Sequence, residues 1–208
     1  MPRQNRYRFP LAIAALLLAL SASNSGGQPA TPAVYPVAPA PSECVIASVP
    51  LEEIVAIRET PVPDAAAIPA PFTIPAGRPA DTETTVDVIA TLRQVFACAN
   101  VGDPLRCASL YSDDFLRSFF GGVPRDDVIA FLSLPPQFFP EDQKRVIIRF
   151  GKVQLLSDGR AGVIIVLDEP DDPRREEPDY AILERIDGRW LVDEIHEDGG
   201  AIATTPAP

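Results

Sequence analysis

Residues 81–198 contain two successive patterns of apolar residues, first one typical of helices and then one typical of strands. Across residues 82–132 apolar side chains recur every three or four positions, the spacing of one helix face. Across residues 145–196 they alternate with polar side chains or form short unbroken runs, which is typical of strands. Helices that precede the strands predict an α+β domain, a cone of N-terminal helices packed on a curved four-stranded antiparallel meander.

Local signals mark the ends of the expected helical segments. The first spans about residues 82–99, with Asp81 able to cap its first amides and Gly102 following its end. The second begins at Asp103-Pro104, a capping side chain followed by proline at the first helical position. The third spans residues 124–132. The helical layer is therefore expected to contain one long helix and shorter pieces.

Two Asp-Gly pairs divide the expected strands into hairpins. Asp158-Gly159 and Asp187-Gly188 each lie between apolar runs. A tight two-residue hairpin turn needs φ above zero at both central residues, which glycine adopts without penalty and aspartate tolerates. Four strands in sequential order are therefore expected at residues 145–156, 161–168, 180–186 and 190–196.

Residues 1–80 differ in composition from the domain that follows. Residues 1–23 join three arginines, an apolar stretch and small residues, the pattern of a secretory signal peptide. Retention as a membrane anchor is the alternative, although the stretch is shorter than the roughly 20 residues that a spanning helix needs. Residues 24–80 predict a Pro/Ala-rich linker, interrupted by an apolar island at 43–58 that we expect to dock on the domain. Residues 199–208 are expected to form a flexible tail.

The chain is acidic, with a formal net charge of −11 at pH 7. Such a surface repels nucleic-acid phosphates and anionic lipid headgroups. We therefore exclude a nucleic-acid partner and expect no membrane insertion once the signal peptide is cleaved. The signal peptide predicts a secreted or extracytoplasmic location.

Three cysteines in a secreted chain allow one disulfide. Cys98 lies near the end of the first helix, roughly 120° around the helix from the core-facing Leu92. Its partner is either Cys44, in the apolar island, or Cys107, across the turn to the second helix. Pairing with Cys44 would also explain why an apolar island interrupts the linker. The sequence has neither a CxxC pair nor a His pair, so we expect no metal site, and no motif indicates a cofactor.

Three stretches give residues 81–198 a family resemblance. They are Asn100-Val101-Gly102-Asp103, Leu110-Tyr111-Ser112-Asp113-Asp114-Phe115 and Asp187-Gly188-Arg189-Trp190-Leu191-Val192. With them the domain resembles the nuclear transport factor two-like superfamily, in particular the secreted SnoaL-like domains of bacteria. The resemblance implies a ligand pocket between the sheet and the helices, and often pairing of two copies through the sheet. The superfamily includes isomerases, hydrolases, scaffolds and transport factors, so it does not choose among these activities.

Six aromatic side chains are candidates for lining such a pocket. They are Tyr111, Phe115, Phe119, Phe131, Tyr180 and Trp190. Large aromatic residues more often fill the core of a domain, and in a cone the core opens into the pocket. The two interpretations are therefore compatible.

Glu194 and His196 are the candidate catalytic residues if the domain is an enzyme. They lie two positions apart on the last expected strand and share a face, whereas Asp193 is expected on the opposite face. A carboxylate beside an imidazole can act as a general base. The other interpretation, which we favour, is an exposed strand end, because Glu197 and further polar residues follow directly. The catalytic sets of known superfamily enzymes do not map onto this chain.

We therefore expect a secreted or surface-exposed domain without catalytic activity that binds a small apolar ligand or a protein partner. One alternative is a small-molecule isomerase or hydrolase that uses Glu194 and His196. Another is a dimerisation module that pairs through the sheet. An enzyme would direct polar groups into its pocket, whereas a binding domain needs only an apolar cleft or an exposed sheet.

Overall fold

A computed structural model of the chain describes residues 35–59, 72–169 and 178–197. The expected signal peptide, the linker segments 24–34 and 60–71, and the tail lie outside the described residues. Within them the chain forms five α-helices, two 3₁₀ turns and a six-stranded antiparallel sheet. The expected α+β class is confirmed.

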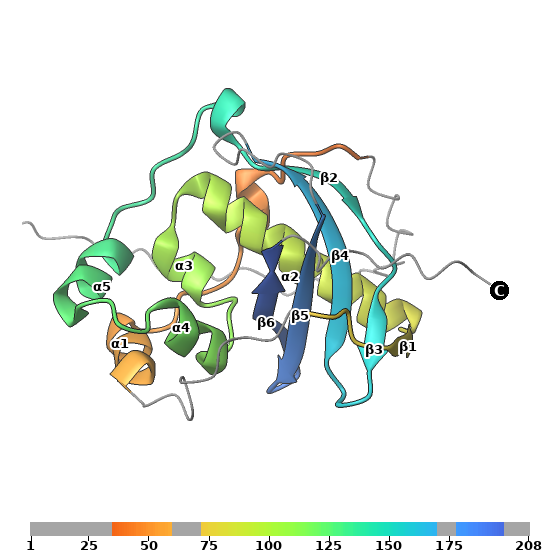
Figure 1. Cartoon of the computed structure of the whole chain (residues 1–208). Coiled ribbons are helices and arrows are strands. Elements are labelled where there is room, and N and C mark those ends of the chain that lie inside the picture. The colour runs from red at the N-terminus through yellow and green to blue at the C-terminus, as the bar shows by residue number, and fades with distance from the viewer. Residues whose placement is uncertain (1–34, 60–71, 170–177, 198–208) are drawn as a thin grey trace, which may run out of the picture. The chain divides into compact units, whose positions relative to one another are not determined.

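The longest helix, α2 (Thr82–Val101), crosses one face of the sheet (Figure 1). At its start the carboxylate of Asp81 accepts a hydrogen bond of 2.7 Å from the amide of Thr84. At its end Gly102 has a φ of 65°, in the left-handed region. A Cβ at Gly102 would also lie 2.2 Å from the carbonyl oxygen of Gln137. The position therefore requires glycine both for its φ and for the close approach of the segment around Gln137.

Four shorter helices gather beside one edge of the sheet (Figure 1). They are α1 (Leu51–Glu59), α3 (Pro104–Ala108), α4 (Asp113–Phe119) and α5 (Arg125–Leu132). Ile54 of α1 is 1% exposed and belongs to a small apolar cluster with Leu116, Phe120 and Val128. The apolar island of the sequence thus supplies a helix that packs against α4 and α5.

The sheet contains two strands more than the sequence predicts. Its strands are β1 (Gly77–Pro79), β2 (Val146–Phe150), β3 (Gln154–Leu156), β4 (Ala161–Asp168), β5 (Pro178–Ile186) and β6 (Arg189–His196). The order is β1-β3-β4-β5-β6, and β2 pairs with β4 as well. The first expected strand is divided between β2 and β3, with the amide of Gly151 donating to the carbonyl of Ile164 between them. The other addition, β1, lies in the expected linker and pairs with β3.

Both Asp-Gly pairs lie at hairpins, but the two turns differ. Asp187 and Gly188 have φ of 50° and 80°, as a two-residue turn requires. At the first hairpin only Gly159 has a positive φ, 89°, and Asp158 does not. The amide of Leu156 donates to the carbonyl of Arg160, which closes a three-residue loop instead. The expectation of φ above zero at Asp158 was wrong.

The main core lies between α2 and the sheet. β4 is central, paired with β2 and β3 on one side and β5 on the other, and six of its eight residues are buried. Its inward side chains meet those of α2, and most of this cluster is less than 5% exposed. Representative members are Val88, Leu92, Val95, Val163, Leu183 and Val192.

The segment before α1 also packs on the domain. Val37 pairs with Ile147 of β2, and Pro39 is buried, so this part of the expected linker packs on the domain, whereas residues 40–42 are exposed. Cys44 and Cys98 form a disulfide, the pairing that the apolar island favoured. The sequence analysis placed Cys98 away from the core-facing side of the first helix. It is nevertheless fully buried, because the segment around Cys44 covers that side of α2.

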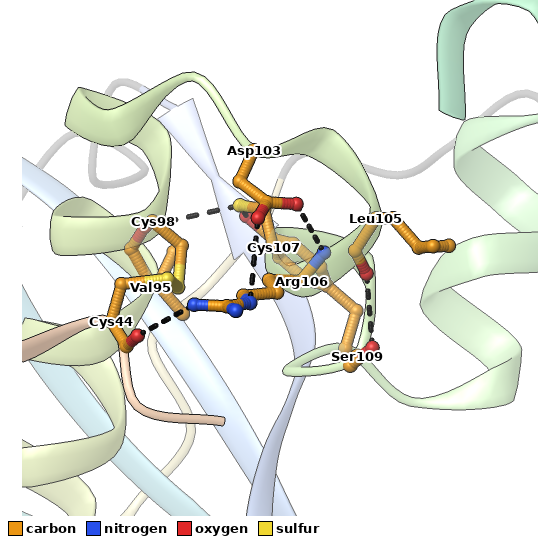
Figure 2. Close-up of a disulfide and its surroundings, with 9 residues drawn as sticks. Cys44, Val95, Cys98, Asp103, Leu105, Arg106, Cys107 and Ser109 are labelled. Atoms are coloured by element: carbon orange, nitrogen blue, oxygen red, sulfur yellow. Dashed lines mark hydrogen bonds and ion pairs between the residues drawn. A yellow bond between two sulfur atoms is a disulfide. The ribbon is translucent and has the colours of Figure 1, made fainter. Parts of the chain in front are cut away.

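Side chains around the disulfide hold α3 against this segment (Figure 2). The guanidinium of Arg106 donates to the carbonyl of Cys44 at 3.3 Å, and Asp103 pairs with Arg106 at 3.4 Å. The thiol of Cys107 lies 3.8 Å from the carbonyl of Val95. Burial raises the pKa of the Cys107 thiol, so it stays protonated and poorly reactive at neutral pH.

Candidate functional site

A cluster of charged side chains lies where the β3–β4 hairpin meets the end of β6. Arg160 binds three carboxylates: Asp158 at 2.8 Å, Asp193 at 2.9 Å and Glu194. Asp193 also accepts a hydrogen bond of 2.6 Å from the hydroxyl of Ser112, the N-cap of α4. The cluster therefore joins a hairpin, an edge strand and a helix start through one guanidinium.

A β-bulge makes this cluster possible. Ile182 of β5 pairs with Glu194, and the next residue, Leu183, pairs with Val192, so the register skips Asp193. Strict alternation would place Asp193 and Glu194 on opposite faces of the sheet. The bulge instead lets both carboxylates reach Arg160.

His196 is held by Glu194 and by an aromatic ring. Its Nε2 atom lies 2.7 Å from Oε2 of Glu194. The ring of Phe72 stacks on the imidazole with centroids 3.4 Å apart, and it also contacts Tyr180. The His196 side chain is 26% exposed, so it is half-buried and not the exposed strand end that we favoured. The segment that begins at Phe72 covers it, and this segment lies in the expected linker.

Arg160 sets the protonation of its neighbours. Burial alone would raise the pKa of Glu194, but hydrogen bonds from Arg160 and His196 outweigh it and lower that pKa. Hydrogen bonds from the amide and side chain of Arg160 likewise lower the pKa of Asp158. Glu194 and Asp158 are therefore ionised at neutral pH, and Arg160 balances only part of their negative charge. The lowered pKa leaves Glu194 a weak base.

The six candidate aromatic residues do not line one pocket. Tyr111, Phe115 and Phe119 stack in a row along α4, with ring centroids 4.3 and 5.9 Å apart. Phe119 and Phe131 are exposed to solvent by 60% and 45%. The remaining two are buried on opposite faces of the sheet, Tyr180 beside Leu156 and Ile182, and Trp190 in the main core.

Tyr180 is a packing residue. A Cβ on Gly162 of β4 would lie 1.9 Å from the Tyr180 hydroxyl oxygen, so the ring occupies the space above that glycine. The hydroxyl is buried and, within the part of the chain that the structure describes, has no hydrogen-bond partner. Burial raises the pKa of Tyr180.

Trp190 lines a groove between α2 and the start of β6. The groove has a volume of about 280 Å³ and opens to solvent. Its apolar lining includes Ile46, Leu110 and Leu191, and its polar lining includes Asp87, Thr91, Gln94 and Arg189. The lining of the groove thus combines apolar side chains with a few polar groups, as is usual for a small-ligand site.

Two polar atoms beside this groove are buried without a partner. Neither Nε1 of Trp190 nor Oε1 of Gln94 has a hydrogen-bond partner among the described residues. The residue Trp190 is only 5% exposed. The hydroxyl of Thr91 donates to the carbonyl of Trp190 at 3.3 Å and does not reach the indole nitrogen. A buried polar group without a partner costs about 1–3 kcal/mol. Both atoms are closed off from solvent, so neither is presented to the groove.

The sequence analysis named Glu194, His196 and Trp190 as candidates but did not name Arg160 or Gln94. Arg160 follows the first Asp-Gly turn, and that position was its only signal. Gln94 lies one turn of helix from Ala90, on the side of α2 that faces the groove. The bulge at Asp193 leaves no pattern in the sequence, because it depends on pairing with β5.

The described residues contain no group of three or more His, Cys, Asp or Glu side chains that could hold a metal ion. In that same part of the chain no helix has both the length and the apolar character needed to cross a membrane. Comparisons with protein-family models, with curated proteins and with solved structures found no match for this chain.

Proposed function

We propose that this chain is a secreted or extracytoplasmic SnoaL-like domain, without catalytic activity, that binds a small ligand in the groove beside Trp190. The single observation that carries the proposal is this groove, which is open to solvent and lined by apolar and polar side chains together. Its volume of about 280 Å³ lies just below the usual range for ligand pockets, which begins at about 300 Å³. The ligand is therefore small, or inserts one small group.

The state of Glu194 and His196 supports a role without catalysis. A general base needs an accessible lone pair and a pKa near the working pH. Glu194 is ion-paired to Arg160, which lowers its pKa and makes it a weak base. Phe72 covers one face of the imidazole. The enzyme alternative, an isomerase or hydrolase, would need this pair to open toward a substrate.

The disulfide supports the extracytoplasmic location. Disulfides persist in oxidising compartments and are rare in the cytosol. Cys44 and Cys98 form one that ties the segment before α1 to α2. We propose that the sheet, with α2 across one face and the shorter helices beside its edge, is the cone of SnoaL-like domains and the scaffold for the groove.

The groove can be tested through its tryptophan. Trp190 is the only tryptophan in the chain, so its fluorescence reports on the groove alone. We expect a titration with a set of small neutral aromatic and amide fragments to change its emission saturably. Ala90 is exposed and lines the groove, so Ala90→Leu should fill it and weaken binding at least tenfold.

Val86→Leu is the matched control, because Val86 lies one turn earlier on α2, is 57% exposed and does not line the groove. His196→Ala should also bind normally, since His196 lies on the opposite face of the sheet from Trp190. The proposal fails if no fragment alters the emission, or if His196→Ala abolishes a turnover that the native protein shows.

A further inference from the structure

We infer that residues 72–79 form a strap over the outer face of the sheet, the face opposite α2, and that protonation of His196 latches this strap in place. The strap begins at Phe72 and ends in β1, which pairs with β3. Its side chains Phe72 and Ile74 pack on a small apolar cluster of the outer face. The cluster consists of Leu156, Tyr180 and Ile182. The inference goes beyond the proposed function and does not depend on the groove.

The stacking of Phe72 on His196 favours a charged imidazole. The two ring planes differ by 9°, and their centroids lie 3.4 Å apart. This separation is no larger than van der Waals contact between carbon atoms, about 3.5–4.0 Å, so the rings overlap face to face with little offset. Two neutral aromatic rings avoid that arrangement, because their negative faces repel each other. A cation over the face of a ring is attracted to it, so the geometry fits an imidazolium against Phe72.

The hydrogen bond to Glu194 favours the same charge state. Nε2 of His196 lies 2.7 Å from Oε2 of Glu194, within the range of about 2.7–2.9 Å for a charged N–H donor on a carboxylate. Arg160 is also positive, but it contacts the other oxygen, Oε1. That guanidinium faces three carboxylates, so the cluster has room for a second positive charge. An imidazolium at this position supplies it.

The titratable neighbours in β5 and in the strap do not oppose a positive charge on His196. Tyr180, its partner in β5, stays neutral, because burial raises the pKa of the hydroxyl. Asp179 precedes Tyr180 and Glu197 follows His196, and both are acidic. The one charged residue of the strap, Arg78, lies in β1, at the end of the strap away from Phe72.

Protonation of His196 therefore holds the strap closed, and deprotonation loosens it. His196 is the only histidine of the chain, and histidine is the side chain whose charge ordinarily changes between pH 5 and 8. A neutral imidazole keeps its contact area with Phe72 but loses the attraction between a cation and the ring. We expect the ratio of open to closed strap to rise about two- to fivefold from pH 5 to pH 8, the effect of one such contact near the surface. Opening exposes the apolar cluster beneath the strap.

A double-mutant cycle tests whether the attraction between the two rings depends on pH. Phe72→Leu, His196→Gln and the double variant are compared with the native protein by urea unfolding at pH 5 and pH 8. The coupling between the two substitutions, expressed as a ratio of unfolding equilibrium constants, should be about two- to fivefold larger at pH 5 than at pH 8. Phe138→Leu, at a residue that is 67% exposed, is the control and should show no coupling to His196→Gln. Equal coupling of Phe72 and His196 at both pH values would overturn the charged latch.

Opening of the strap can be followed by NMR at the methyl groups of Ile74. Phe72→Ala gives the position of these resonances when the strap is released. In the native protein they should move toward that position as pH rises from 5 to 8. In His196→Gln, whose side chain does not titrate, they should stay in place. Movement of equal size in both proteins, or no movement in the native protein, would overturn the latch.

Discussion

Arg160 is the residue on which the charged cluster depends. Its guanidinium contacts Asp158, Asp193 and Glu194, and the Asp193 side chain is only 9% exposed. The contacts to both Asp193 and Glu194 could not be predicted by counting along the strand, because alternation places these two residues on opposite faces and only the bulge lets both reach Arg160. The sequence did predict that Glu194 and His196 share a face, because they lie on the same side of the bulge.

Replacing Arg160 tests the cluster through pH. The pKa of Glu194 is lowered in the folded protein, so the stability that it contributes is present above its ordinary pKa of about 4.5 and is lost as pH falls through the folded value. Arg160→Gln should lower the free energy of unfolding by about 1–3 kcal/mol at pH 7, because charged hydrogen bonds are lost. The difference from the native protein should shrink toward pH 3, as measured by urea unfolding.

Arg117→Gln is the control for this prediction. Arg117 pairs with Asp114, whose side chain is 73% exposed, so the loss should stay below about 1 kcal/mol at any pH. The contrary result is a free energy of unfolding of Arg160→Gln that differs from that of the native protein by the same amount at pH 7 and pH 3. That result would show that Arg160 does not lower the pKa of the carboxylates.

At the scale of elements, local sequence signals predicted the helix starts, whereas strand boundaries that depend on long-range pairing could not be predicted. Asp81, Asp103 and Ser112 each cap a helix through contacts within three residues, so these starts could be read from the sequence. The division of the first expected strand into β2 and β3 could not, because it depends on how Gly151 meets β4. The added strand β1 depends likewise on pairing with β3.

The disulfide should stabilise the contact between the segment before α1 and α2. Cys44 and Cys98 are 54 residues apart, and closing a loop of that length stabilises a domain by about 2–4 kcal/mol. We expect a reducing agent, or the double substitution Cys44→Ser with Cys98→Ser, to lower the free energy of unfolding by this amount. Guanidinium unfolding with and without reductant measures it.

Cys107→Ala provides the control for the disulfide. Cys107 takes no part in the bridge, so this variant should keep the full effect of the reducing agent. If reduction leaves the stability of the native protein unchanged, the bridge does not hold this segment in place. If Cys107→Ala removes the effect, Cys107 and not Cys44 is the partner in solution.

At the scale of the whole molecule, the composition of a candidate pocket could be predicted but its location could not. The six aromatic residues were chosen by type, and the fold distributes them over a row along α4 and two opposite faces of the sheet. Trp190 alone of the six lines the groove, because β6 turns its ring toward α2. Which aromatic side chain reaches a cavity depends on packing between elements that lie far apart in the sequence.

The measurement that tests the account most directly is a map of backbone and indole amide shifts while small neutral fragments are titrated into the intact protein. The account predicts that the shifts gather on the groove, at Thr91, Gln94, Gly188 and the indole N–H of Trp190. It also predicts no chemical conversion of any fragment. Shifts that gather instead around Phe72 and His196, together with turnover that His196→Ala abolishes, would contradict it and establish the enzyme alternative.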